Sequence, residues 1–150
     1  MHANYLRNVI NSVTRLDVVA KARRRLRRER FDTIAVRGVS GISIGAILAH
    51  GLKKELAVVR KEMNPLHTDN VVESPQAVVR YVIVDDFSSS GETLYHITRN
   101  MRTSHPNALC VGLLQYNRID LFKEAEDVED MVKNFIRLYP EKAVLESKIV

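Results

Sequence analysis

The sequence has one cysteine, no tryptophan and no long hydrophobic run. A lone Cys110 can form no disulfide within the chain and excludes a cysteine-based zinc site. No apolar stretch approaches the roughly 18 residues needed to cross a bilayer. The segment Met1–Asp17 also lacks the continuous hydrophobic centre of a secretion signal. We therefore expect a cytoplasmic protein with no membrane partner.

The chain also lacks internal repeats, low-complexity tracts and any linker that would divide it. Its 150 residues, 45% of them hydrophobic and 27% charged, suit a single globular domain with a real core. We expect one domain over 1–150. An N-terminal helix would occupy 1–30, the core 31–116, and a C-terminal helix 117–150, the two chain ends forming a small hood region.

The net charge of +5 comes from one segment. Lys21–Arg30 holds seven basic residues and one acidic residue, whereas the other 140 residues together carry a charge of −1. Such a segment could attract nucleic acid, polyphosphate or an acidic partner. It is more often a solvated helix end, where cations also suit the helix dipole. Nucleic acid is thus a possible partner, but not the favoured one.

Hydrophobic periodicity predicts alternating strands and helices. The expected strands cover 31–36, 56–59, 78–84 and 108–115. The expected helices cover 4–29, 41–53, 92–102 and 121–139, the first burying Leu6, Val9, Val13 and Leu16 against its own domain or a partner subunit. This order predicts an α/β fold, with a Rossmann-like, mainly parallel sheet flanked by helices. Lys61–Gln76, which contains two prolines, is expected to be a long loop.

Two loops follow strands of this sheet, and ligands of such folds bind at the carboxyl ends of the strands. In Asp85–Thr93, the carboxylates of Asp85 and Asp86 can accept hydrogen bonds from vicinal sugar hydroxyls or help hold a divalent cation. The hydroxyls of Ser88–Thr93, the turn allowed by Gly91 and a helix N-terminus then form a phosphate cradle. The combination predicts a ribose 5-phosphate site, although a capped strand-to-helix turn uses similar residues.

The segment Val82–Leu94 resembles the signature of the type I phosphoribosyltransferases. The resemblance implies that Asp85 and Asp86 are catalytic, hold the ribose hydroxyls of phosphoribosyl pyrophosphate (PRPP), and meet Mg²⁺ through those hydroxyls and water. It also implies that the 5′-phosphate is bound by Ser88, Ser89, Ser90, Gly91, Glu92 and Thr93.

The resemblance continues upstream and covers about 31–115. Arg37–Gly41 follows the first core strand, where the family has its pyrophosphate loop, and the second strand ends in two basic residues. The resemblance implies pyrophosphate binding by Arg37, Gly38, Arg60 and Lys61, of which Arg60 and Lys61 are also catalytic. Met63–Gln76 takes the place of the family's active-site flap.

Two positions depart from the family pattern, and the base-binding site is the part that the sequence motifs indicate least clearly. Ser89 stands where the 6-oxopurine branch has an aspartate, and Glu92 stands where glycine or a basic residue is frequent. Gln115, Tyr116 and Asn117 follow the last strand and are candidates for binding the base. A polar turn explains these three residues equally well.

The resemblance implies an enzyme that transfers the 5-phosphoribosyl group from PRPP to a nucleobase, with purine somewhat favoured, and releases pyrophosphate. It further implies Mg²⁺ as cofactor, a role in nucleotide salvage and a homodimer. The alternative is a non-catalytic regulatory protein of the same fold, which binds PRPP or a nucleotide and reaches nucleic acid through Lys21–Arg30.

Overall fold

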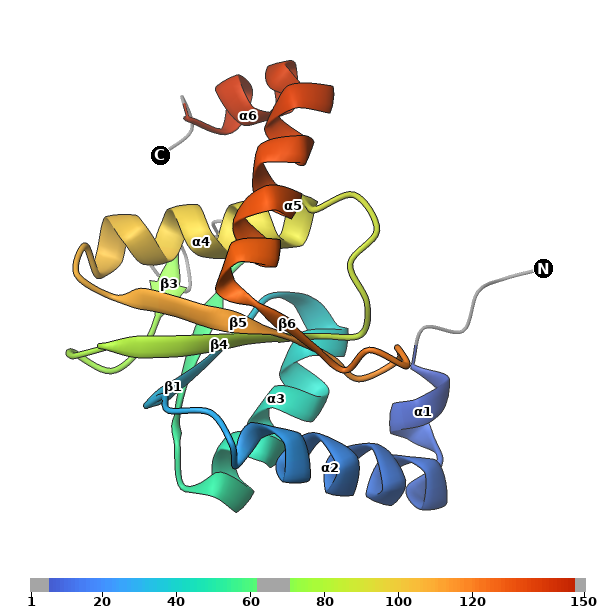
Figure 1. Cartoon of the computed structure of the whole chain (residues 1–150). Coiled ribbons are helices and arrows are strands. Elements are labelled where there is room, and N and C mark those ends of the chain that lie inside the picture. Colours follow the sequence, from blue (N-terminus) through green and yellow to red (C-terminus); the bar gives the residue numbers. More distant parts are fainter. Residues whose placement is uncertain (1–5, 62–70, 148–150) are drawn as a thin grey trace, which may run out of the picture.

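The computed structural model describes residues 6–61 and 71–147 and contains a six-stranded sheet with the order β3-β2-β1-β4-β5-β6 (Figure 1). The strands are β1 (Thr33–Val36), β2 (Glu55–Val59), β3 (Val72–Glu73), β4 (Arg80–Asp85), β5 (Leu109–Gln115) and β6 (Phe122–Glu124). The four central strands are parallel, and the edge strands β3 and β6 pair antiparallel. This confirms the predicted α/β fold with a mainly parallel sheet.

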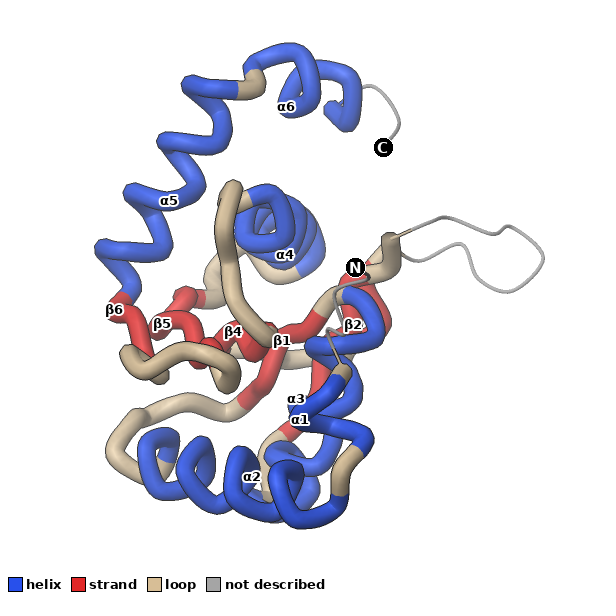
Figure 2. Tube along the Cα trace, turned by 90° about the vertical axis from the view of Figure 1, so that its right-hand side faces the viewer, coloured by secondary structure: helices blue, strands red, loops and turns tan. Residues whose placement is uncertain are grey.

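Helices cover both faces of the sheet (Figures 1 and 2). On one face lie α1 (Arg7–Ile10), α2 (Ser12–Leu26) and α3 (Gly38–Leu52); on the other lie α4 (Glu92–Ser104) and α5 (Ala125–Leu138), followed by α6 (Pro140–Ser147). Each face has its own hydrophobic cluster, centred on Leu26, Ile44 and Leu48 below the sheet and on Leu94, Ile97 and Met101 above it. In residues 6–61 and 71–147, no helix has the length and apolar character to span a membrane.

The connections of the sheet place both candidate loops at one point. The chain passes from β1 through α3 to β2 on one face, and from β4 through α4 to β5 on the other. The strand order therefore reverses between β1 and β4, and such a reversal opens a crevice at the carboxyl ends of the strands. Arg37 follows β1 at this edge, and Asp86 follows β4.

The N-terminal helix differs from the prediction because Asn11 divides it. The Asn11 side chain accepts hydrogen bonds from the amides of Val13 and Thr14, at 2.9 and 3.2 Å, and so starts α2 as an N-cap. The predicted burial within the domain is wrong for Val13 and Leu16, which are 73% and 70% exposed. Farther along α2, Ala22 and Leu26 are buried instead.

Three other boundaries differ from those predicted. The edge strand β6 occupies 122–124, so α5 begins later than the predicted helix over 121–139. Pro140 ends the apolar stripe, as predicted, but also begins α6, because proline tolerates the first turn of a helix. The expected loop over 61–76 contains β3, and residues 62–70 of the expected flap lie outside the described part of the chain.

Candidate functional site

The carboxylate pair, Asp85 and Asp86, is buried at the carboxyl end of β4, with exposed fractions of 5% and 8%. Burial, followed by the nearby charge of Asp86, raises the pKa of Asp85 to about 7. The Ser40 hydroxyl, from the first turn of α3, donates to Asp85 Oδ1 at 3.4 Å. Burial of two neighbouring carboxylates lowers the free energy of unfolding. The pair therefore suits a ligand that supplies hydroxyl donors or positive charge.

We expect the variant Asp85→Asn to be more stable than wild type at about pH 8, with a free energy of unfolding about 1–3 kcal/mol higher. The ordinary pKa of aspartate, 3.8, applies in the unfolded chain, whereas the folded Asp85 keeps its proton to about pH 7. The cost of ionising it is therefore absent below about pH 4, grows as the pH rises to about 7, and stays at its full value above. Urea unfolding of both proteins at about pH 4, 6 and 8 measures this difference. A variant that is less stable than wild type at pH 8 would contradict the assignment.

The phosphate loop, Ser88–Thr93, joins the carboxylate pair to α4. Gly91 is the N-cap of α4 and has a φ of 86°, in the left-handed region that glycine favours. Among the described residues, the amides in this loop that have no hydrogen-bond acceptor are those of Ser89, Ser90, Gly91 and Thr93. Free amides at a helix N-terminus, with the positive end of the helix dipole, form an anion site. The arrangement suits the predicted phosphate cradle.

The predicted pyrophosphate loop is the first turn of a helix. Arg37 is the N-cap of α3, which begins at Gly38, three residues earlier than predicted. Gly38 has a φ of 82°, and a Cβ atom placed on it would lie 2.9 Å from Lys61 Cε and 3.2 Å from Lys61 Nζ. The Lys61 side chain therefore lies directly over the start of α3. Gly38 and Lys61, two predicted pyrophosphate residues that follow different strands, thus meet at one place.

The other two predicted pyrophosphate residues point to different neighbours. The Arg60 guanidinium forms an ion pair with Glu73 of β3, with a distance of 3.0 Å between Nη1 and Oε2. Arg37 lies near α4: after burial, its charge is the largest cause that lowers the pKa of His96 to about 4. His96 is 7% exposed and stays neutral near pH 7. The structure thus ties Arg60 to the sheet edge and brings Arg37 towards the first turns of α4.

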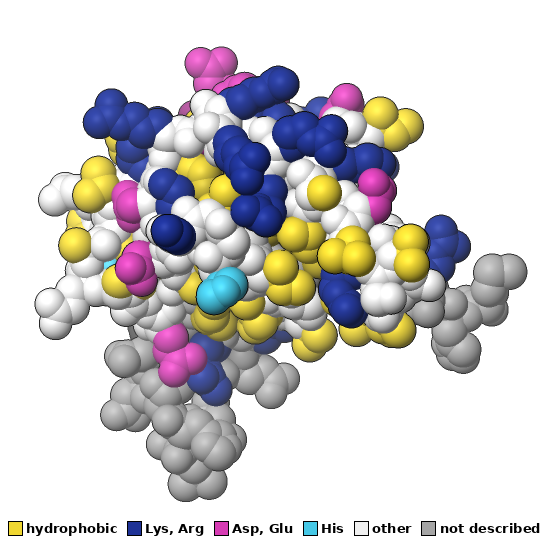
Figure 3. All heavy atoms as spheres, turned by 90° about the horizontal axis from the view of Figure 1, so that it is seen from below, with side chains coloured by type: hydrophobic (Ala, Val, Ile, Leu, Met, Phe, Trp, Pro, Cys, Tyr) yellow, Lys and Arg dark blue, Asp and Glu magenta, His cyan; other side chains and the backbone are white. Residues whose placement is uncertain are grey.

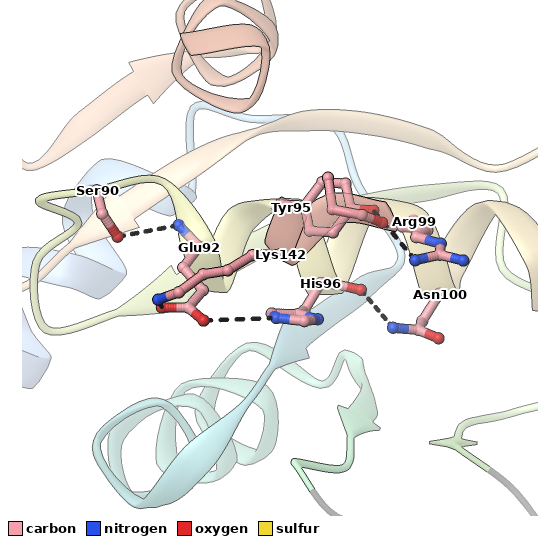
Figure 4. Close-up of polar contacts among 8 residues, drawn as sticks. Ser90, Glu92, Tyr95, His96, Arg99, Asn100 and Lys142 are labelled. Atoms are coloured by element: carbon pink, nitrogen blue, oxygen red, sulfur yellow. Dashed lines mark hydrogen bonds and ion pairs between the residues drawn. The ribbon is translucent and has the colours of Figure 1, made fainter. Parts of the chain in front are cut away.

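Glu92 is the one acidic residue of the phosphate loop, and one cation from a distant segment, Lys142, faces it. Its carboxylate lies 3.8 Å from Lys142 Nζ of α6 and 3.9 Å from His96 Nε2 (Figure 4). The Tyr95 hydroxyl donates to the backbone oxygen of Ala143 at 3.0 Å and fixes α6 beside α4. Lys142 thus offsets the negative charge that Glu92 would otherwise present to an anion. No local pattern in the sequence indicated this neighbour.

The three candidate base residues have different positions. Gln115 and Tyr116 are each 4% exposed and bind within the domain: Gln115 Oε1 accepts from the Ser88 amide at 2.9 Å, and the Tyr116 hydroxyl donates to the Ser40 backbone oxygen at 2.9 Å. Asn117 is exposed and lines two open cavities of about 510 and 560 Å³ at the same edge of the sheet. Base binding by these three residues stays a prediction. Asn117 is the one of the three whose side chain is exposed to a cavity.

The carboxylate pair supplies too few ligands to hold a metal ion alone. Among the described residues, no three His, Cys, Asp or Glu side chains converge on one point. Mg²⁺ takes about six oxygen ligands and keeps several waters, so a substrate and water would have to supply most of them. The two carboxylates therefore fit Mg²⁺ that arrives with a polyphosphate ligand, as the sequence resemblance implied.

Solved structures with the same fold are phosphoribosyltransferases and a related synthase. Leishmania donovani UMP synthase has a TM-score of 0.61 at 23% identity and matches 75% of this chain. Mycobacterium tuberculosis orotate phosphoribosyltransferase, solved with PRPP, has a TM-score of 0.60 at 15% identity over 75% of this chain. Thermoanaerobacter pseudethanolicus adenine phosphoribosyltransferase has a TM-score of 0.54 at 20% identity over 69% of this chain. These likenesses confirm the predicted type I phosphoribosyltransferase fold.

The matched region is only part of the first two neighbours, covering 24% of the synthase chain and 64% of the orotate enzyme, against 68% of the adenine enzyme. Searches with protein-family models and among curated proteins gave no match. The similarity therefore establishes the fold, and the chemistry has to be argued from the residues of this chain.

Proposed function

We propose that this protein is a phosphoribosyltransferase, which transfers the 5-phosphoribosyl group of PRPP to a ring nitrogen of a nucleobase and releases pyrophosphate. The observation that carries the proposal is the buried carboxylate pair directly before the free amides of α4. In PRPP the ribose hydroxyls lie next to the 5′-phosphate, just as the carboxylate pair lies next to the free amides in this chain. The carboxyl ends of β1 and β4, where the strand order reverses, are also where such a fold binds its ligand.

Each part of the site has a task in the proposed reaction. The amides of the phosphate loop hold the 5′-phosphate, and Asp85 and Asp86 accept hydrogen bonds from the ribose hydroxyls. Lys61 and the N-terminus of α3 neutralise the negative charge of the departing pyrophosphate. The base nitrogen forms a bond to C1 of the ribose as the bond from C1 to pyrophosphate breaks, and the proton on that nitrogen passes to water or to pyrophosphate. Positive charge develops on the ribose ring during this exchange. The carboxylate pair is placed to stabilise that charge.

Mg²⁺ bound to the diphosphate would add further charge neutralisation of the leaving group. Asp85 and Asp86 would hold it through the ribose hydroxyls and water. The protein residues would position PRPP, and the cavity beside Asn117, which Ser88 also lines, is the candidate place for the base. We propose a cytoplasmic enzyme of nucleotide salvage, with purines as the first candidate acceptors.

The proposal is tested by measuring pyrophosphate release from Mg²⁺–PRPP with a panel of bases that contains adenine, hypoxanthine, guanine, uracil and orotate. We expect release that depends on one base or one base class and that yields the matching nucleotide. Tight PRPP binding without release in the presence of any base would favour the non-catalytic alternative instead. A protein that neither binds nor consumes PRPP would contradict both.

The basic segment Lys21–Arg30 is partly engaged within the domain. Arg23 donates to the Gly51 backbone oxygen at 3.4 Å, and Arg25 pairs with Glu29 at 2.7 Å while lying 4.2 Å above the Phe122 ring. These arginines support the packing of α2, as aliphatic stems and stacked guanidinium groups commonly do. These two arginines thus have partners within the domain, whereas Arg24, Arg27 and Arg28 are exposed.

We expect Arg24→Glu with Arg28→Glu to leave turnover of PRPP and base unchanged, because both exposed side chains lie outside the site. We also expect wild type to show no salt-sensitive binding of nucleic acid, since the regulatory alternative is not favoured. An electrophoretic shift assay at physiological salt, together with the turnover assay, checks both expectations. Retention of nucleic acid by wild type, lost in the double variant, would support the regulatory alternative.

A further inference from the structure

Tyr116 connects two parts of the proposed site that come from different elements. It follows β5 directly, is 4% exposed and belongs to the hydrophobic cluster below the sheet, together with Val36 and Ile44. Its hydroxyl donates to the Ser40 backbone oxygen, in the first turn of α3, at 2.9 Å. Its backbone amide donates to the Asp85 backbone oxygen at 3.1 Å. One buried residue thus joins the end of β4 to the start of α3.

A third hydrogen bond closes this connection into a cycle. The Ser40 hydroxyl donates to Asp85 Oδ1 at 3.4 Å, so the residue that accepts from Tyr116 also contacts the carboxylate pair. Burial, followed by the charges of Asp86 and Asp85, raises the pKa of the Tyr116 hydroxyl. The hydroxyl therefore keeps its proton and remains a donor. We name Tyr116, Ser40 and Asp85 the Tyr116 network.

The first turn of α3 is held from its inner side. A Cβ atom placed on Gly41 would lie 3.0 Å from the Val84 backbone oxygen, so the helix lies close against the end of β4. On the outer side Val39 is 67% exposed, and Figure 3, which views this face of the molecule, shows hydrophobic side chains at its surface. The position of this turn therefore depends on its contacts with β4, Lys61 and Tyr116.

The distance between α3 and β4 sets the separation of two subsites of the proposed reaction. The carboxylate pair and the phosphate loop belong to one segment, Asp85–Thr93, so the groups proposed for ribose and 5′-phosphate keep their spacing without α3. The place proposed for pyrophosphate is the start of α3 beside Lys61. Negative charge develops on pyrophosphate as its bond to C1 breaks. A displacement of ~1 Å between the reacting atoms and the groups that position them can lower the rate about 100-fold.

We propose that Tyr116 is a positioning residue, which holds the first turn of α3 at the distance from the carboxylate pair that the departure of pyrophosphate requires. The inference rests on the proposed function and adds to it a residue that acts through Ser40. This role differs from the contact with the base that the sequence predicted for Tyr116.

The test compares Tyr116→Phe with wild type in two assays: turnover of Mg²⁺–PRPP with the base that the panel identifies, and binding of ribose 5-phosphate alone. The variant keeps the aromatic ring in the core and loses only the hydroxyl. We expect kcat to fall at least about tenfold while KM for PRPP changes less than about threefold, because the loss lies in stabilising the leaving group. The Kd of ribose 5-phosphate should stay within about twofold of wild type, since its contacts come from residues 85–93 alone.

Tyr81→Phe is the matched control. Tyr81 is 3% exposed and lies at the opposite end of β4, so this variant also loses a buried hydroxyl, but away from the site. Its kcat and its Kd for ribose 5-phosphate should stay as in wild type. Circular dichroism and urea unfolding show whether each variant is folded and how much stability it has lost.

Ser40→Ala is a milder test of the same connection, because it removes the hydroxyl that meets Asp85 and leaves the backbone oxygen for Tyr116. We expect kcat to fall about threefold or more, as for the loss of one hydrogen bond. The double variant of Ser40→Ala with Tyr116→Phe should lose less than the product of the two single effects, because residues of one network do not act independently.

A folded Tyr116→Phe or Ser40→Ala variant with the kcat of wild type would overturn the proposal. So would single effects that multiply fully in the double variant, or loss of ribose 5-phosphate binding in folded Tyr116→Phe, which would give Tyr116 a part in holding the whole site. A wild type that turns over no PRPP would instead overturn the proposed function, and this inference with it.

Discussion

The double variant Asp85→Asn with Asp86→Asn is expected to bind PRPP at least about 100-fold more weakly than wild type. Each hydrogen bond from a ribose hydroxyl to an ionised carboxylate contributes about 1.5–3 kcal/mol to binding. The same variant should be at least as resistant to denaturant as wild type near neutral pH. Its folded state no longer keeps two buried carboxylates next to each other. Loss of binding together with unchanged or higher stability is what distinguishes a ligand site from a carboxylate pair that stabilises the fold.

Isothermal titration of Mg²⁺–PRPP into wild type and variant measures the first effect, and urea unfolding without ligand measures the second. Asp130→Asn is the matched control, since Asp130 is an exposed acid on α5, and both quantities should stay as in wild type. A double variant that binds PRPP as tightly as wild type would show that the ribose lies elsewhere. A double variant that is much less stable than wild type would show that the pair serves the fold.

The variant Gly91→Ala is expected to lower the free energy of unfolding by about 2–4 kcal/mol. Gly91 has a φ of 86°, which strains any residue with a Cβ atom. That Cβ would also lie 2.6 Å from the Met131 backbone oxygen of α5 and 3.3 Å from Phe135 Cβ. Since backbone cannot yield as a flexible side chain can, α5 or the phosphate loop has to move, and PRPP binding should weaken as well.

Gly51→Ala is the control for this substitution. Gly51 lies in the last turn of α3, and its added Cβ would meet only the end of the Arg23 side chain, at 3.2 Å. A change from glycine to alanine in a helix stabilises by up to about 1 kcal/mol, so this variant should be neutral or slightly stabilised. Urea unfolding of the three proteins compares them. Equal stability of Gly91→Ala and wild type would mean that the loop is not held against α5.

Local patterns in the sequence predicted the sheet and the central part of the site. The nearly continuous apolar run before Asp85 predicted a buried strand, and the residues from Asp85 to Thr93 are adjacent in the chain. A site built from one strand-to-helix connection can be identified because no folding is needed to bring its members together. Arg37 and Gly38 were assigned through the family resemblance, and the structure shows that they follow β1, the neighbour of β4 in the sheet.

Contacts between distant segments could not be predicted in this way. Lys142 lies 50 residues after its neighbour Glu92, and Met131 lies 40 residues after its neighbour Gly91, so no local pattern connects them to the phosphate loop. The break at Asn11 was missed because apolar spacing continues across it, while a single capping side chain stops the helix. The edge strand β6 is three residues long, too short for an alternating pattern to differ from a helical one.

A crystal structure of the full chain with Mg²⁺–PRPP would show directly whether PRPP binds at the carboxylate pair. We expect the 5′-phosphate within hydrogen-bond distance of the free amides between Ser89 and Thr93, and the ribose hydroxyls on Asp85 and Asp86. We also expect the pyrophosphate group beside Lys61 and the first turn of α3. PRPP bound away from the carboxylate pair, or a phosphate loop whose amides all bond within the protein while PRPP is present, would contradict it.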